Sequence, residues 1–334
     1  VIVVSRGGES AVVIECLDVE TGDVRWRQMF GIPVASVLGQ VTADSLLLLD
    51  ESGRFRRLQV ADSGWKVQSL PDPPWQRAES ENDASPLAVQ TSDACTAPAQ
   101  LVAYLDRDLR LSMQAANGNV YRCQGDVSWP RSGWLQPLWL SCATVLFAHP
   151  RGIIALATLE PATQPPALRV SAARRVAAGM VSGINAAGGQ LSLTSGSECL
   201  VLERDSLVVI QRHPLPAPAS TPPAGAGTLH VGLNDGTLLV IENPASDNAE
   251  VTRVPLSAAP LDSLSYCAAT QTVFAIDAAD HVFAVDADRH IVERWSFESA
   301  AAGAPFFVGK HAFLATAEGG LHELVSESRE ATSP

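Results

Sequence analysis

Short apolar runs recur along the chain in pairs, and a tight polar turn joins the two runs of each pair. The clearest pairs are residues 228–242, with Asp-Gly at the turn, and residues 272–286, with Ala-Asp at the turn. Apolar runs joined in this way predict β-hairpins. Six more pairs follow the same pattern, at residues 1–17, 45–60, 101–113, 144–159, 190–202 and 312–325. The sequence therefore predicts eight hairpins.

The spacing of the hairpins indicates how they are organised. Successive hairpins begin about 44 residues apart, as at Thr228 and Thr272, and this is the length of a four-stranded propeller blade. Further extended runs flank many hairpins, such as residues 260–266 and 291–297, and complete the four strands. The 24 Gly and 22 Pro residues interrupt most windows in which a long helix would form.

These patterns predict an all-β fold, a single β-propeller domain over residues 1–334 with eight four-stranded blades. Seven blades are the alternative, because residues 143–170 and 180–213 carry the poorest motifs. The terminal blades are predicted to be incomplete, because no inner strand can precede residues 1–17 and residues 326–334 are too polar for a good outer strand. Propellers commonly close by letting one terminus donate a strand to the blade of the other, and the sequence accounts for only part of such a closure. Residues 71–86 and 213–227 are rich in Pro, Ala, Asp or Ser, and we predict that they are surface loops or linkers.

Composition and charge limit the classes of partner. Hydrophobic residues make up 46% of the chain and charged residues 18%, which favours a folded chain with a large core. A net charge of −13 disfavours nucleic acid as a partner, and no apolar run approaches the length of a membrane span. The chain opens with Val1 rather than Met; we expect a processed or trimmed fragment, or part of a larger protein.

The six cysteines are scattered without metal-binding or redox spacing, and most fall in apolar runs: Cys16, Cys95, Cys123, Cys142, Cys199 and Cys267. We expect buried free thiols rather than disulfides. The sequence also contains no Asn-x-Ser/Thr acceptor for glycosylation. Both observations favour an intracellular, cytoplasmic location.

One stretch carries a more specific motif. Residues 16–26 read Cys-Leu-Asp-Val-Glu-Thr-Gly-Asp-Val-Arg-Trp, which resembles the Ala-x-Asp-x-x-Thr-Gly-x-x-x-Trp repeat of PQQ-like, quinoprotein-type β-propellers. Asp18, Thr21 and Gly22 are expected to form a tight turn in which Gly22 adopts positive φ, while Trp26 packs between blades. A weaker copy at residues 284–295 keeps Asp286 and Trp295 but lacks Thr-Gly.

The resemblance implies one of two roles. Quinoprotein dehydrogenases hold a quinone and calcium in the central channel, beside a disulfide between adjacent cysteines, whereas other members of the family only bind proteins. This sequence has no adjacent cysteine pair. The resemblance therefore implies the non-catalytic branch, with no cofactor.

Candidate chemistry elsewhere is sparse. The zinc motif HExxH, the phosphate-binding loop, the GxSxG nucleophile elbow and the EF-hand loop are all missing from the sequence. One group of carboxylates and imidazoles has metal-binding chemistry: Asp277, Asp280, Asp286, Asp288, His281 and His290. Because these residues fall at hairpin turns, where Asp caps the backbone, we interpret them as turn residues. We predict no catalytic, cofactor-binding or metal-binding residue.

Two tryptophans in proline-containing segments are candidate partner contacts. Trp75 and Trp129 each lie next to prolines, and exposed tryptophans are frequent interface anchors. The loop around Trp75 is acidic, with Asp72, Glu79, Glu81 and Asp83, which favours a protein partner with a basic surface. The predicted function is a non-catalytic scaffold for protein–protein interaction, part of a larger protein or complex; the alternative is a propeller that holds a ligand or metal in its central channel.

Overall fold

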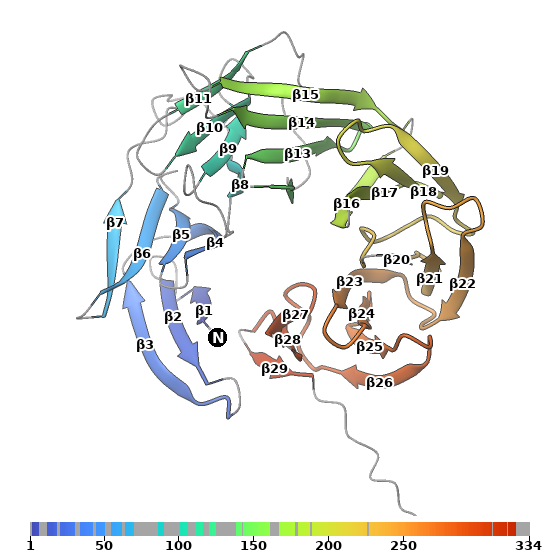
Figure 1. Cartoon of the computed structure of the whole chain (residues 1–334). Coiled ribbons are helices and arrows are strands. Elements are labelled where there is room, and N and C mark those ends of the chain that lie inside the picture. The colour runs from blue at the N-terminus through green and yellow to red at the C-terminus, as the bar shows by residue number, and fades with distance from the viewer. Residues whose placement is uncertain are drawn as a thin grey trace, which may run out of the picture. The chain divides into compact units, whose positions relative to one another are not determined.

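A computed structural model describes the chain in segments. The described residues are 2–6, 12–18, 21–30, 34–42, 45–50, 55–61, 64–69, 86–89, 101–105, 111–115, 120–124, 138–141, 143–160, 167–177, 180–187, 189–225, 227–308, 310–318 and 320–324. They contain β-strands and no helix (Figure 1). In particular, no helix long and apolar enough to cross a membrane occurs in these segments.

The chain divides into two compact units. The first comprises Val1–Phe147 with Ala155–Ala173, and the second comprises Ala148–Ile154 with Arg174–Pro334. Within the described residues, each sheet is a meander of strands that are consecutive in sequence and antiparallel, apart from a parallel pair described below.

The first sheets follow the chain order. One contains β1 (Ile2–Arg6), β2 (Val12–Leu17) and β3 (Val24–Phe30), and the next contains β4 (Val34–Thr42), β5 (Ser45–Asp50), β6 (Phe55–Ala61) and β7 (Gly64–Ser69). An eight-stranded sheet joins two four-stranded meanders: β8 (Pro86–Val89), β9 (Leu101–Leu105), β10 (Leu111–Ala115) and β11 (Val120–Gln124), then β12 (Leu138–Trp139), β13 (Thr144–His149), β14 (Ile153–Glu160) and β15 (Ala167–Arg175). The join is the parallel pairing of β11 with β15, where Cys123 faces Leu168.

The second unit holds four more sheets. Their strands are β16 (Val181–Ala187), β17 (Gln190–Ser195), β18 (Glu198–Glu203) and β19 (Val209–Pro214); β20 (Thr228–Gly232), β21 (Thr237–Glu242) and β22 (Glu250–Pro255); β23 (Leu261–Cys267), β24 (Thr272–Asp277), β25 (His281–Val285) and β26 (Ile291–Ser296); and β27 (Phe306–Val308), β28 (His311–Ala315) and β29 (Leu321–Glu323). The described residues thus form eight successive meanders, the predicted number. The first and last sheets each have three described strands.

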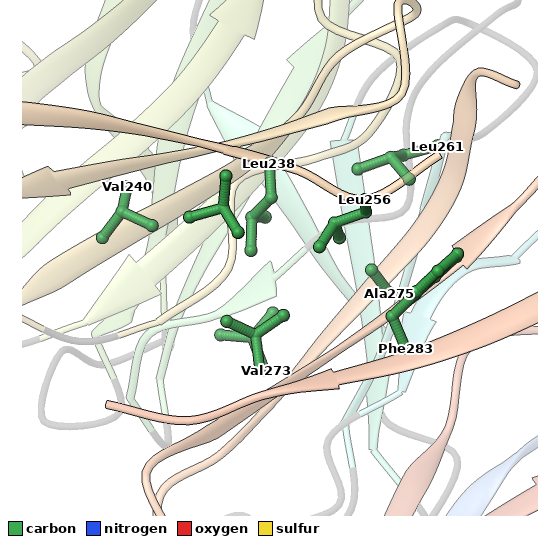
Figure 2. Packing of buried hydrophobic residues seen from close by; sticks show 9 residues of the cluster. Leu238, Val240, Leu256, Leu261, Val273, Ala275 and Phe283 are labelled. Carbon is green, nitrogen blue, oxygen red and sulfur yellow. The ribbon is translucent and has the colours of Figure 1, made fainter. Parts of the chain in front are cut away.

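Burial explains why middle and outer strands differ in sequence. The middle strands β18 and β21 carry four consecutive buried residues, because both of their faces are covered, and such strands read as continuous apolar runs. The outer strand β26 alternates exposed and half-buried residues over most of its length. Between the sheets β20–β22 and β23–β26 lies a hydrophobic cluster that includes Leu238, Val273 and Phe283 (Figure 2).

Residues 213–227 are irregular after the end of β19, and some of their side chains are buried. Leu215 and Thr221 are buried, and isolated bridges pair Ala219 with Leu233 and Ala224 with His230. The Thr221 hydroxyl accepts a hydrogen bond from the Gly232 N–H at 2.9 Å. The segment therefore covers the open edge of β20 without forming a regular strand, since its prolines cannot donate a continuous ladder of hydrogen bonds. The other predicted loop, residues 71–86, lies outside the described residues except for Pro86 in β8.

Three cysteine side chains are described, and all three are free thiols. They are Cys16, Cys199 and Cys267, of which the last two are buried. Burial raises the pKa of the Cys199 thiol to about 12, so this thiol is protonated and unreactive at neutral pH.

Candidate functional site

The motif at residues 16–26 forms a hydrogen-bonded turn between β2 and β3. The Asp18 carboxylate accepts the Thr21 N–H at 3.3 Å, and the Thr21 hydroxyl accepts the Asp23 N–H at 3.2 Å. Gly22 has a φ of 75°, a left-handed conformation that glycine adopts without strain. The Arg25 guanidinium also donates to Asp18, through Nε at 2.9 Å. These polar groups serve the turn itself.

Of the two motif tryptophans, Trp26 and Trp295, the structure describes the side chain of Trp295 only. The backbone of Trp26 lies in β3 and pairs with Cys16, but its side chain lies outside the described part, so its burial stays a prediction. Trp295 in β26 is half-buried and stacks on Phe274, with ring centroids 6.2 Å apart. It packs against a buried cluster that includes Phe274 and Leu314. The degenerate repeat therefore places its tryptophan against the core between two sheets.

Asp286 closes the turn between β25 and β26. Its carboxylate accepts the His290 N–H at 2.8 Å, which is the turn role expected of it. Asp286, Asp288 and His290 also bring one possible metal-ligand atom each to within 4.8 Å of one another. Asp288 and His290 are exposed, and exposed carboxylates gather at turns without a metal.

The predicted partner contacts are two tryptophans and four acidic residues. Trp75 and Trp129 lie outside the described residues, as do the acidic neighbours of Trp75, namely Asp72, Glu79, Glu81 and Asp83. Their role stays a prediction.

A pocket that the sequence interpretation missed lies in the second unit, beside the β23–β26 sheet. Its volume is about 520 Å³, and its lining comes from the loop after β22, the turn between β24 and β25, and Arg294 of β26. Leu256, Ala258 and Ala259 supply apolar wall, while Asp277 and His281 supply polar groups.

Asp277 organises the polar side of the pocket. Its carboxylate accepts the Ser257 hydroxyl at 2.6 Å and the N–H groups of Ala279 and His281 at 2.9 Å each. The Nδ1 atom of His281 lies 3.0 Å from the same carboxylate. Burial alone would raise the pKa of Asp277, but the hydrogen bonds from Ser257, His281 and Ala279 outweigh it and lower that pKa below its usual value of 3.8. The carboxylate is therefore ionised, and both of its oxygen atoms accept hydrogen bonds.

Ser257, Asp277 and His281 are the residue types of a hydrolase triad, but they are joined in a different order. In a triad the histidine contacts the serine and the carboxylate orients the histidine. Here the serine donates to the carboxylate instead, so His281 does not take its proton. This arrangement stabilises a turn and does not activate a nucleophile.

Arg294 provides the cation of the pocket. Its guanidinium carbon lies 5.0 Å from the centroid of the Phe283 ring, a cation–π geometry that holds the charge over an apolar surface. The sequence offered one signal for this residue: Arg212, Arg253 and Arg294 recur at intervals of 41 residues, on the outer strands of three successive sheets.

Comparisons with known proteins support the fold and leave the family open. No protein-family model matches the sequence, and no curated protein sequence matches it. Solved structures do match over nearly the whole chain. BamB from Moraxella catarrhalis has a TM-score of 0.64 at 12% identity, covering 96% of this chain and 95% of its own. The computationally designed Ika8 protein has a TM-score of 0.69 at 12% identity, covering 96% and 92%.

A third similar structure is Sqt1 from Chaetomium thermophilum, determined bound to the N-terminus of the ribosomal protein L10. It has a TM-score of 0.63 at 11% identity and covers 93% of this chain and 88% of its own. At these identities the likeness concerns the fold alone. Together with the meanders of consecutive antiparallel strands, it shows that this chain has the β-propeller fold.

Proposed function

We propose that this chain is a non-catalytic β-propeller scaffold for protein–protein interaction that acts as a domain or subunit of a larger protein or complex. We also propose that residues 1–334 form one propeller domain and that its repeats belong to the non-catalytic branch of the PQQ-like family. The motif at residues 16–26 supports the family, because Asp18, Thr21 and Gly22 form the turn that this motif specifies.

One observation carries the proposed function: the chain shares its fold, over 93% of its length, with an Sqt1 structure that was determined with a bound protein segment. The chemistry of the described turns supports the same function. Asp18, Asp277 and Asp286 all accept hydrogen bonds from nearby backbone N–H groups. Carboxylates used in this way stabilise loops and are not poised as acids or bases.

The partner contact is proposed to lie in the segments around Trp75 and Trp129. Trp75 is flanked by Asp72, Glu79, Glu81 and Asp83, so an aromatic anchor lies in sequence among negative charges. This combination suits a partner with a basic surface, since opposite charges speed association and the tryptophan supplies buried contact area.

Affinity purification with the wild-type chain and a Trp75→Ala, Trp129→Ala double variant tests this proposal. The double variant should fold normally and lose one or more partners that the wild type captures. Identical partner profiles from a folded double variant would remove these segments from the binding surface. A wild-type chain that captures no specific partner at all would overturn the scaffold function.

The alternative function is binding of a ligand or metal by the propeller, and one observation favours it: the close approach of Asp286, Asp288 and His290. Elemental analysis and an absorption spectrum of the purified chain separate the two functions. A stoichiometric metal or a chromophore would favour the alternative.

A further inference from the structure

The pocket lined by Arg294 has a cation with no ion-pair partner among the residues that the structure describes. Arg294 is exposed, and its guanidinium lies over the Phe283 ring. Its equivalent in the sheet β16–β19, Arg212, is paired with Glu198 at 3.2 Å. In a protein of net charge −13, an arginine without a carboxylate at the edge of a pocket is a natural site for an external anion.

The rest of the pocket selects the kind of anion. Leu256, Ala258 and Ala259 form an apolar wall, which suits a carboxylate attached to a hydrocarbon body better than a small inorganic ion. The Asp277 side chain is fully buried. Its carboxylate accepts hydrogen bonds from Ser257, Ala279 and His281 and is not directed at a ligand. Asp277 also binds Nδ1 of His281, which leaves Nε2 as the ring nitrogen available to a ligand.

The hydrogen bonds of the backbone around the pocket indicate which kind of carboxylate it suits, that of an acidic side chain or that of a C-terminus. A C-terminal carboxylate is usually captured by a nest of free backbone N–H groups. Here the N–H groups of Leu256 and Ser257 donate to the Gly236 carbonyl. The N–H of Ala259 donates to the Ser257 hydroxyl, and those of Ala279 and His281 donate to Asp277. These groups cannot form a nest.

We propose that this pocket binds an aspartate or glutamate side chain of a partner protein. Arg294 would be the main group that binds the carboxylate, and the wall at Leu256, Ala258 and Ala259 would receive a neighbouring apolar residue. The proposal rests on the proposed scaffold function. It adds a second docking surface, which takes an acidic segment, whereas the Trp75 loop is assigned a basic partner.

The sheet arrangement supplies a matched control for Arg294. Arg294 pairs with Phe283, the third residue of β25, and Arg253 pairs with Leu239, the third residue of β21. Arg253 is likewise exposed and has no ion pair among the described residues, but it does not line the pocket. Replacing either arginine removes the same charge from the same strand position.

The test measures fluorescence anisotropy of three labelled pentapeptides with the full chain. The first is Ala-Leu-Glu-Leu-Ala amide, the second has Gln in place of Glu, and the third is the Gln peptide with a free C-terminus. The Glu peptide should bind with a Kd below about 1 mM, and the Kd of the Gln amide should be about tenfold higher. Arg294→Gln should raise the Kd of the Glu peptide about tenfold. Arg253→Gln should leave this Kd within about twofold of the wild-type value.

A second pair of variants tests the pocket at an exposed position, where substitution should not unfold the chain. Ala258 is exposed, so Ala258→Asp and Ala258→Asn should keep the wild-type thermal midpoint, and only the Asp variant should repel the Glu peptide. Equal binding of the Glu and Gln amides, equal losses in Arg294→Gln and Arg253→Gln, or no binding of the Glu peptide would overturn the proposal. Preference for the free C-terminus would overturn the choice of a side chain. Such failures leave the scaffold function standing if the wild-type chain still captures partners in affinity purification.

Discussion

The imidazole of His230 stacks on the phenol ring of Tyr266, with ring centroids 5.6 Å apart and an angle of 19° between the planes. His230 lies on β20 and Tyr266 on β23, so the pair joins two successive sheets. His230 is 9% exposed, and its Nδ1 atom has no hydrogen-bond partner among the described residues. Burial lowers the pKa of His230 to about 4, although the backbone hydrogen bond to Ala224 opposes this effect.

This burial predicts an acid-sensitive stability. The folded state holds His230 neutral down to about pH 4, whereas the unfolded chain takes up the proton near pH 6.5. The stabilising contribution is therefore fully present above about pH 6.5 and is lost as the pH falls toward 4, by about 3 kcal/mol in total. Urea unfolding of the wild type at several pH values between 7.5 and 4 measures this loss.

His230→Phe keeps an aromatic ring against Tyr266 and removes the titrating group, so it serves as the control. Its free energy of unfolding should fall less steeply with pH over the same window. Equal slopes for the two proteins would show that His230 does not carry the effect.

The sequence predicted local structure well where that structure depends only on two strands adjacent in the chain. Residues 228–242 were predicted as a hairpin, and they form β20 and β21 with a turn in which Gly236 has a φ of 81°. Residues 213–227 were predicted as a surface loop or linker, and the described part after β19 is irregular, but the pattern did not predict the burial of Thr221, which depends on Gly232 and on Thr194 from another sheet. No local pattern in a proline-rich segment encodes such contacts.

The pocket could not be predicted for a related reason. Ser257, Asp277 and Arg294 lie on three different elements, and only the packing of two sheets and the register of β25 with β26 bring them together. The sequence did predict that Asp277 caps a turn, since that role depends on residues four positions away at most. The burial of Trp26 and the contacts of Trp75 stay predictions.

Gly236→Ala should be strongly destabilising. A Cβ atom there would lie 2.1 Å from the Ser257 carbonyl oxygen and 2.7 Å from that of Ala259, and the positive φ adds strain for any L side chain. We expect a loss of about 2 kcal/mol or more in the free energy of unfolding, measured in urea. Gly22→Ala is the matched control, because its φ of 75° is similar but no atom lies within 4 Å of the added Cβ. Equal losses would mean that the contact with Ser257 contributes nothing.

Trp26→Ala should lower the free energy of unfolding by roughly 3–5 kcal/mol if the tryptophan packs between blades as the repeat motif implies. Trp295→Ala is a useful comparison, because Trp295 is half-buried against Phe274 and should cost less. Thermal and urea unfolding of both variants check the order. An unchanged midpoint for Trp26→Ala would show that this side chain is superficial and would weaken the resemblance to the PQQ-like repeat.

Substitutions at Asp277 and Ser257 separate a structural role from a chemical one. Asp277→Ala should cost about 3 kcal/mol, because the N–H groups of Ala279 and His281 would lose their acceptor inside the turn. Ser257→Ala should cost less, about 2 kcal/mol, because it removes two hydrogen bonds, one donated to Asp277 and one accepted from the Ala259 N–H.

The pH dependence of these variants is also distinct. The pKa of Asp277 is lowered below 3.8, so the carboxylate stabilises the fold above that pH and loses its effect only in stronger acid. Between pH 4 and pH 7.5, Asp277→Ala should therefore be destabilised by a nearly constant amount relative to the wild type, unlike His230→Phe. Urea unfolding at the same pH values tests this directly. A difference that changes steeply within that range would mean that Asp277 titrates near neutral pH, as an acid–base catalyst does, and would contradict its assignment as a turn residue.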